Sequence, residues 1–225
     1  MGTKKYRLTG NHINIGNRIL YQIEALKDFG NVKSGDLGGY IESEENLSQY
    51  DNAWVYGDAQ VLGNAQVYGD AQVYGNAQVY GNAQVFGNAW VFGNAWVCDN
   101  AKVCDNAEVH GNAKVCDNAK VYGDAKVCDN ADVFGNAQVY GDAEIKSKED
   151  YIVFKNWWSS GRYFTWTRSN NMWKVGCFYG TGEELIKKAY NDSKESCREY
   201  ERIVRYVESI LADEKRKENE PIGIK

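Results

Sequence analysis

Apolar and polar positions follow a strict six-residue period from residue 51 to residue 146. This segment divides into sixteen hexads of the form [GD]-[ND]-A-x-V-[YFC], in which the third position is always Ala and the fifth is Val in fifteen hexads and Ile145 in the last. Side chains alternate along a strand, so Ala and Val point to one side and the variable residue to the other. The [GD]-[ND] pair tolerates left-handed backbone at a corner. The pattern predicts short strands joined by corners, with Ala and Val buried.

One hexad cannot bury its own Ala and Val, so the units must stack into a solenoid. The pattern resembles that of hexapeptide-repeat proteins, which fold as a left-handed parallel β-helix. In that family three hexads form one triangular coil of eighteen residues. The resemblance implies about five coils that rise by the strand spacing of ~4.8 Å. Such a prism is filled by Ala and Val, so any function must lie on its outside.

The two flanking segments are aperiodic. Residues 1–50 predict a β-rich cap with a hairpin at Gly16-Asn17, which would cover an open solenoid end. Residues 147–212 predict a small α+β module, with two strands joined at Asn170-Asn171. Thr181 and Glu184 form the capping box of a short helix. A longer helix follows, with an apolar stripe at Cys197, Tyr200, Val204, Val207 and Leu211, and residues 213–225 are predicted to be a charged, frayed tail.

The implied eighteen-residue coil determines which outer residues stack. The three edges carry ladders of mainly aromatic residues: Tyr56, Tyr74, Phe92, His110 and Cys128; Leu62, Tyr80, Cys98, Cys116 and Phe134; and Tyr68, Phe86, Cys104, Tyr122 and Tyr140. Trp54 and Trp90 occupy the outward slot of one face, and Trp96 that of the next. Such rings need cover, either from the caps or from another protomer. Because hexapeptide β-helices commonly form trimers, we predict a homotrimer with an interface at Trp54, Trp90 and Trp96, and a dimer as the alternative.

Charge and cysteine content restrict the partners and the compartment. The chain has a net charge of −5, and residues 51–146 carry five basic and twelve acidic side chains, which argues against a direct nucleic-acid contact by the repeat. No apolar run suits a membrane span or a secretory signal, so we expect a cytoplasmic protein with no membrane partner. The six cysteines are then expected to be thiols. Cys98 and Cys116 stack closely enough for a disulfide, so their pairing stays open.

Enzymatic and metal chemistry find little support. Many hexapeptide β-helices are acyltransferases with a catalytic His in the coils, and here only His110 lies in the repeat. His110 and Cys128 stack as a possible base and nucleophile, with no third group to orient the His. A γ-class carbonic anhydrase needs three His ligands, but the chain has only His12 and His110. The repeat cysteines lie 6, 12 and 12 residues apart and do not converge on one ion. We therefore assign no catalytic residue, metal or cofactor.

A ligand-binding surface is predicted in the C-terminal module. In "RYFTWTR", the residues Arg162, Phe164, Trp166 and Arg168 share one face of a strand, with Trp157, Trp158, Trp173 and Lys174 close by in sequence. Aromatic planes with guanidinium groups suit a ligand that carries a base and a phosphate. The alternative is that Phe164 and Trp166 belong to the core, with the two arginines reaching water at the strand ends.

Repeats of the V-[YFC]-[GD]-[ND]-A type also resemble those of phage, prophage and gut-bacterial proteins, a family that implies no established reaction. "GCFYGTGEEL" and the later "REY" resemble the terminal module of such phage proteins. We interpret the chain as a non-enzymatic binding protein on an oligomeric β-helix. As a hypothesis, it is a phage-encoded factor in the host cytoplasm that sequesters a host defence component, either a nucleotide signal or an immune protein. An acyltransferase using His110 and a purely structural self-assembling protein are the alternatives.

Overall fold

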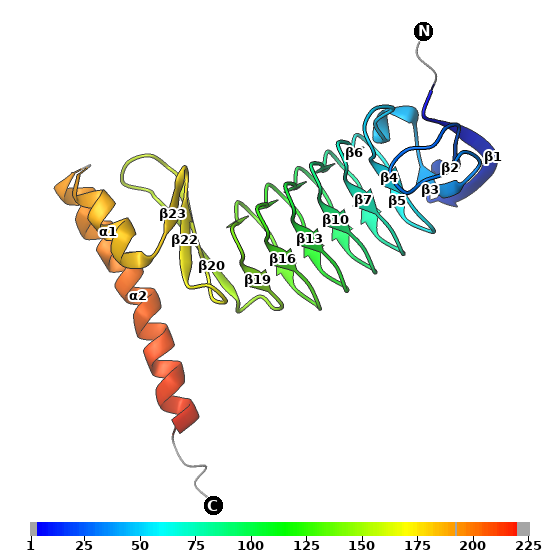
Figure 1. Cartoon of the computed structure of the whole chain (residues 1–225). Coiled ribbons are helices and arrows are strands. Elements are labelled where there is room, and N and C mark those ends of the chain that lie inside the picture. The colour runs from blue at the N-terminus through cyan, green and yellow to red at the C-terminus, as the bar shows by residue number, and fades with distance from the viewer. Residues whose placement is uncertain (1–3, 192, 220–225) are drawn as a thin grey trace, which may run out of the picture.

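The computed structural model describes residues 4–191 and 193–219 and shows a rod with a different cap at each end (Figure 1). An antiparallel sheet lies at the N-terminal end, and a second antiparallel sheet with two helices lies at the C-terminal end. Between them the chain winds as a parallel β-solenoid. The predicted order of cap, repeat and α+β module is therefore found along the chain.

Sixteen two-residue strands build the solenoid, one from each hexad. They fall into three parallel sheets, in which each strand pairs with the strand eighteen residues further on, as Trp90 pairs with Glu108. The first sheet contains β5 (Gln60–Val61), β8 (Gln78–Val79), β11 (Trp96–Val97), β14 (Lys114–Val115) and β17 (Asp132–Val133). The second contains β4 (Trp54–Val55), β7 (Gln72–Val73), β10 (Trp90–Val91), β13 (Glu108–Val109), β16 (Lys126–Val127) and β19 (Glu144–Ile145). The third contains β6 (Gln66–Val67), β9 (Gln84–Val85), β12 (Lys102–Val103), β15 (Lys120–Val121) and β18 (Gln138–Val139).

The solenoid interior consists of the Ala and Val side chains that the period predicts. Every repeat Ala is fully buried, and the repeat Val residues and Ile145 are at most 1% exposed. Backbone hydrogen bonds join successive coils, for example from Trp90 N to Ala107 O and from Phe92 N to Val109 O, both at 2.9 Å. Sixteen hexads at three per coil fill five coils and one strand of a sixth, so the second sheet has a sixth strand and the solenoid has about six turns.

The corners need a left-handed residue, which is Gly in most hexads and Asp after each repeat Cys. Asp99, Asp105, Asp117 and Asp129 have φ between 57° and 60°, a region that is costly for a residue with a Cβ. Three of these carboxylates accept a hydrogen bond from the backbone N–H eighteen residues further on; Asp117 accepts from Gly135 N at 2.9 Å and Asp105 from Gly123 N at 3.1 Å. A bond of this kind between coils offsets part of the backbone strain.

The N-terminal cap continues the first sheet. The strands β1 (Tyr6–Ile15) and β2 (Arg18–Ala25) form the predicted hairpin at Gly16, and β3 (Leu37–Ile41) pairs in parallel with β5. The short 3-10 helix η1 (Glu44–Asn46) leads into the first coil. The buried Lys5 donates hydrogen bonds from Nζ to Ala53 O at 2.8 Å and to Tyr50 O at 3.1 Å. The cap thus satisfies backbone carbonyls at the open solenoid end.

The C-terminal module is a four-stranded antiparallel sheet followed by two helices. Its elements are β20 (Tyr151–Lys155), β21 (Tyr163–Thr167), β22 (Met172–Val175), β23 (Phe178–Gly180), α1 (Gly182–Tyr190) and α2 (Lys194–Asn219). Tyr151 and Val153 pack against the solenoid core, whereas Ile152 and Phe154 pack into a second core with the helices. The two faces of the sheet therefore have different roles, and one of them closes the end of the solenoid.

The helices follow the predicted signals but extend further. Thr181 and Glu184 form the capping box of α1, and Cys197, Tyr200, Val204 and Val207 are buried along α2. The α2 helix continues through residues 213–219, part of the predicted frayed tail, where Glu214 pairs with Arg168 and Asp213 with Arg216. Residues 220–225 of that tail lie outside the described residues. Neither described helix is long and apolar enough to cross a membrane.

Candidate functional site

The outer surface of the solenoid has three flat faces, which we name after one residue each. The Trp96 face carries Gln60, Gln78, Trp96, Lys114 and Asp132 in its outward slots. The Trp90 face carries Trp54, Gln72, Trp90, Glu108, Lys126 and Glu144. The Lys102 face carries Gln66, Gln84, Lys102, Lys120 and Gln138. Because the core is filled, chemistry or binding by the repeat must use these faces or the edges between them.

Trp90 and Trp96 are the large apolar residues exposed in the outward slots. Trp90 is 43% exposed and Trp96 38% exposed, each on a strand of the same coil. Each ring makes an edge contact with a tyrosine of the preceding coil, with ring centroids 6.4 Å apart for Tyr74 and Trp90 and 6.3 Å for Tyr80 and Trp96. Lys114 Nζ lies 4.9 Å from the centre of the Trp96 ring. No part of the described chain buries these two rings fully, so their predicted role in an interface stays open.

Trp54 is different, and its prediction as an interface residue is wrong. It is only 1% exposed, because Tyr6 and Phe29 of the N-terminal cap make edge contacts with its ring at centroid distances of 6.0 and 5.3 Å. A Cβ on Gly38 would lie 2.8 Å from Trp54 Cζ2, so this position of the cap has to be Gly. The sequence left two alternatives for burying the tryptophans, either the caps or another protomer. For Trp54 it is the N-terminal cap of the same chain.

The predicted ligand surface of the C-terminal module is largely core. Phe164, Trp166 and Trp173 are 0–2% exposed and pack with α1 and α2. The indole of Trp166 donates a hydrogen bond to Asn171 Oδ1 at 2.9 Å. The prediction that these rings are open to a ligand is therefore wrong, and the alternative, a core role for Phe164 and Trp166, is confirmed. Alternation had placed them on one strand face correctly, but the helices cover that face.

The remaining members of the predicted ligand set do not converge. Arg168 binds Glu214 in an ion pair at 2.7 Å, and Lys174 Nζ lies 4.7 Å from the centre of the Tyr140 ring at the junction with the solenoid. Trp158 packs against the module core, whereas Trp157 is 79% exposed. Arg162 lines a small hollow of about 50 Å³ together with Cys177, Phe178 and Lys188. In the described part of the chain, these predicted residues therefore do not line one common pocket.

The aromatic edges form the predicted stacks. Tyr74 and Phe92 stack with centroids 4.8 Å apart, Phe92 and His110 at 4.7 Å, and Tyr68 and Phe86 at 4.9 Å. His110 is one rung of such a ladder on an open edge. Burial raises the pKa of the adjacent Cys128 thiol, which disfavours the thiolate that a nucleophile needs. The geometry gives no support to catalysis by this pair.

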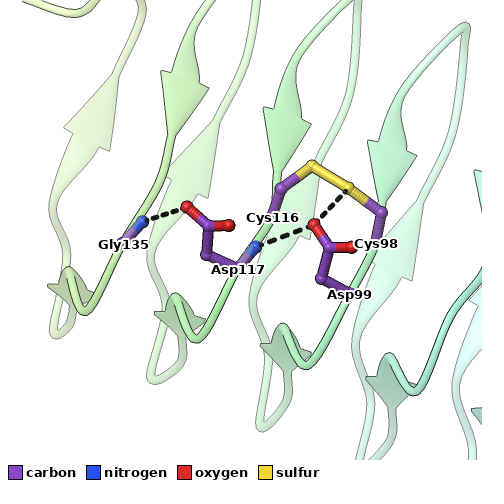
Figure 2. Close-up of a disulfide and its surroundings, with 5 residues drawn as sticks. All are labelled: Cys98, Asp99, Cys116, Asp117 and Gly135. Atoms are coloured by element: carbon purple, nitrogen blue, oxygen red, sulfur yellow. Dashed lines mark hydrogen bonds between the residues drawn. A yellow bond between two sulfur atoms is a disulfide. The ribbon is translucent and has the colours of Figure 1, made fainter.

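Cys98 and Cys116 form a disulfide, which corrects the expectation of thiols (Figure 2). They occupy the same edge on successive coils, and their Cα atoms are 4.7 Å apart, within the range of disulfides. The neighbouring Asp99 carboxylate points toward them and accepts a hydrogen bond from Asp117 N at 3.3 Å. Its Oδ2 lies 3.6 Å from Cys98 Sγ, and since a disulfide sulfur carries no hydrogen, this is a contact rather than a hydrogen bond.

Two surface hollows were not apparent in the sequence. One, of about 520 Å³, lies where the N-terminal cap meets the first coils and includes Arg18, Glu42 and Tyr80. Another, of about 350 Å³, follows the third edge beside the stacked Lys102 and Lys120. The first depends on the packing of the cap, which has no periodic signal. The second has a signal in the sequence, because Lys102 and Lys120 are eighteen residues apart and therefore stack on successive coils.

Comparison with known proteins supports the fold of the repeat. The chain is similar to a family described as the YdcK β-solenoid repeat, at residues 65–81, 71–85 and 83–99. No curated protein matches the chain. The family match lies within the segment that the structure shows as parallel coils. The protein is thus a β-solenoid repeat protein with a cap at each end.

Proposed function

We propose that the protein is a non-enzymatic scaffold whose copies pack side by side through the Trp90 face of one copy and the Trp96 face of another. The observation that supports it most is the match between the two faces, level by level along the rod. The chain's own caps cover both ends of the solenoid, so the coils of two copies cannot pair end to end without displacing a cap. The flat faces of the solenoid are left for contacts between copies, and two of them carry the exposed Trp90 and Trp96.

The two faces complement each other when two rods lie with parallel axes. Consecutive strands of one coil lie at nearly the same height, so Trp90 of one copy comes opposite Trp96 of another. One coil before this, Gln72 comes opposite Gln78. One coil after it, Glu108 comes opposite Lys114, and the next coil places Lys126 opposite Asp132. A central aromatic contact with opposite charges beside it is typical of a specific protein interface.

Two charged residues that form no ion pair within the described part of one copy support the same arrangement. Glu108 already pairs with Lys126 at 3.1 Å, but Lys114 and Asp132 form no ion pair with any other residue that the structure describes. In the assembly each of these two faces an opposite charge. The contact uses two different surfaces of each copy, so repeated contacts close into a ring when the rotation permits. The resemblance to hexapeptide-repeat proteins favours a ring of three copies, a homotrimer.

Sedimentation of the full chain at micromolar concentration tests the proposal. The wild type is expected to sediment as an oligomer, and Trp90→Lys together with Trp96→Lys is expected to give the 25.4 kDa monomer with an unchanged β-rich circular dichroism spectrum. Gln66→Lys with Gln84→Lys, on the Lys102 face, is the matched control and should keep the oligomer. A wild-type monomer under these conditions would overturn the proposal.

A charge exchange distinguishes the proposed packing of the Trp90 face on the Trp96 face from nonspecific hydrophobic association of exposed tryptophans. Lys114→Glu should weaken the oligomer, because it places two carboxylates opposite each other across the interface. Adding Glu108→Lys should restore part of it, because the charges across the interface are then reversed while the ion pair of Glu108 with Lys126 within each copy is lost. Failure of the double variant to recover would argue against the parallel register. Consumption of acyl-coenzyme A that is lost in His110→Ala would instead favour the acyltransferase alternative.

A further inference from the structure

We propose that, in the reduced chain, Cys98, Cys116 and Asp99 bind one thiophilic divalent cation of the zinc type, and that the disulfide and the metal ion are alternative occupants of this edge. The three residues are the only group of metal-ligating side chains that the described part of the chain brings together. They lie on the second edge, which borders the Trp96 face, and none of the three is among the interface residues named above. The inference rests on contacts within one copy and does not require the proposed assembly.

The distances suit a tetrahedral site. The two sulfur atoms and the nearest Asp99 oxygen all lie within 4.8 Å of one another, and Asp99 Oδ2 is 3.6 Å from Cys98 Sγ. A tetrahedral zinc with its usual bonds to sulfur and carboxylate oxygen separates neighbouring ligand atoms by roughly 3.6–3.8 Å. Cleavage of the S–S bond lets the two sulfur atoms separate to about that distance by side-chain rotation. The backbone need not move, because the register of β11 with β14 fixes the two Cα atoms.

The Asp99 carboxylate is already oriented for this role (Figure 2). Asp99 has φ 57°, and Asp117 N donates to its Oδ2, so the side chain is held against the sulfur pair. Cys98 is 4% and Cys116 8% exposed, whereas Asp99 is exposed to solvent. The sulfurs therefore sit in a shielded position, and the fourth ligand position faces water. An open fourth position is a common feature of zinc sites with three protein ligands.

Electrostatics favours a cation here once the disulfide is opened. Two thiolates and a carboxylate at this spacing repel one another, and Asp117 adds a further carboxylate one coil away. A divalent cation removes that repulsion. In binding, each thiol gives up its proton to solvent and each sulfur donates an electron pair to the ion. In oxidation, the two thiols and a low-molecular-weight disulfide exchange to give the protein disulfide and two small thiols, so no other oxidant is needed.

The repeat contains an internal comparison. Cys104 is also followed by an Asp at positive φ, but its neighbours on the third edge are Phe86 and Tyr122. Cys128 is followed by Asp129 and has His110 one coil before it. Within residues 4–191 and 193–219, only Cys98 and Cys116 place two sulfur atoms on successive coils of one edge. Cys104 therefore provides a matched control for Cys98.

Cobalt binding to the reduced full-length chain tests the site. After reduction with a phosphine under native conditions, titration with Co²⁺ is expected to give one equivalent bound, with thiolate-to-cobalt charge-transfer absorption that Zn²⁺ abolishes. Cys98→Ser and Cys116→Ser should each remove this absorption, whereas Cys104→Ser should leave it unchanged. Asp99→Asn should weaken the affinity by about tenfold or more, by analogy with the loss of a group that supports a metal site. Oxidised glutathione should displace the ion.

Three results would overturn the proposal. The first is a disulfide that resists reduction while the chain stays folded, as judged by the count of titratable thiols against circular dichroism. The second is a reduced wild type with no charge-transfer absorption. The third is an absorption that survives in Cys98→Ser or is lost equally in Cys104→Ser, because the ion would then bind elsewhere.

Discussion

The solenoid and the C-terminal module both bury a hydrophobic core, but they fill it with side chains of very different size. The solenoid core is built from small identical side chains, Ala and Val, repeated in register. The module core is built from a few large rings, among them Phe164, Trp166 and Trp173. In the solenoid each coil contacts only its neighbours, so stability is spread along the rod. In the module a single ring touches several elements, so stability is concentrated in a few residues.

This difference should be most visible in the response to loss of one aromatic core residue. Trp166→Ala removes a fully packed indole and its hydrogen bond to Asn171, and is expected to lower the free energy of unfolding of the module by about 3–5 kcal/mol. Trp157→Ala, at a ring that is 79% exposed, should change it by about 0.5 kcal/mol or less. Hydrogen exchange followed by mass spectrometry should show faster exchange in residues 151–211 and little change in the coils. Equal exchange along the whole chain would mean that module and solenoid unfold as one unit.

The solenoid should instead be sensitive to added volume. Ala95→Leu at mid-rod places three extra carbons in a filled interior and is expected to cost about 1–3 kcal/mol or more. Gln78→Leu, on the outside of the preceding coil, should cost little. The measurement is urea unfolding followed by circular dichroism for both variants. Equal shifts in the unfolding midpoint would contradict the inward placement of Ala95.

The N-terminal cap differs from both regions in that it buries a charge. Burial lowers the pKa of Lys5 to about 8, with Asp51 opposing this change. Between pH 8 and 10.5 the unfolded chain keeps the proton that the folded chain has lost. The contribution of Lys5 to stability is therefore lowest below pH 8 and rises as the pH increases through this window.

The free energy of unfolding of the wild type, relative to Lys5→Met, is accordingly expected to increase by about 1 kcal/mol between pH 8 and 9.5. The measurement is urea unfolding of both proteins across this range. The range ends at pH 9.5 because burial also raises the pKa of Tyr6, so ionisation of this tyrosine in the unfolded chain lowers the stability of both proteins at higher pH. A constant difference between the two proteins would mean that Lys5 keeps its proton in the folded chain across this range.

The smallest effect is expected at the ion pair between the module sheet and α2. Arg168 and Glu214 are 32% and 43% exposed, so Arg168→Ala should lower the free energy of unfolding by about 0.2–1 kcal/mol at low salt and by less at high salt. Arg202→Ala, which loses a pair within α2, serves as the control. A loss above about 2 kcal/mol would show that Arg168 supports the module in another way.

Much of the fold could be predicted because the sequence repeats. Burial of Ala95 and Val97, the stacking of Tyr74 on Phe92, and the corner at each Gly or Asp all follow from a six-residue period and an eighteen-residue coil. The hairpin at Gly16 and the capping box of Thr181 could be predicted for a related reason. Each of these signals depends on residues a few positions apart.

The candidate sites were predicted less well, because they depend on which surface covers which. Trp54 and Trp90 occupy equivalent slots, yet the cap buries the first and leaves the second exposed. Trp166 and Arg168 share a strand face, and only the position of α2 shows that one ring is core and one guanidinium is bound to Glu214. Sequence also placed Cys98 beside Cys116, but it could not choose between thiols and a disulfide.

The sequence by itself determined the solenoid, its buried face, its edges and the existence of a different segment at each end. These features arise from local backbone geometry and a fixed repeat, which are properties of short stretches of chain. Only the tertiary structure decided that the module sheet closes the rod, that Trp54 is covered and Trp90 is not, and that Asp99 lies against the sulfur pair. These outcomes depend on contacts between residues far apart in the chain, whose energies come from packing that no local pattern encodes.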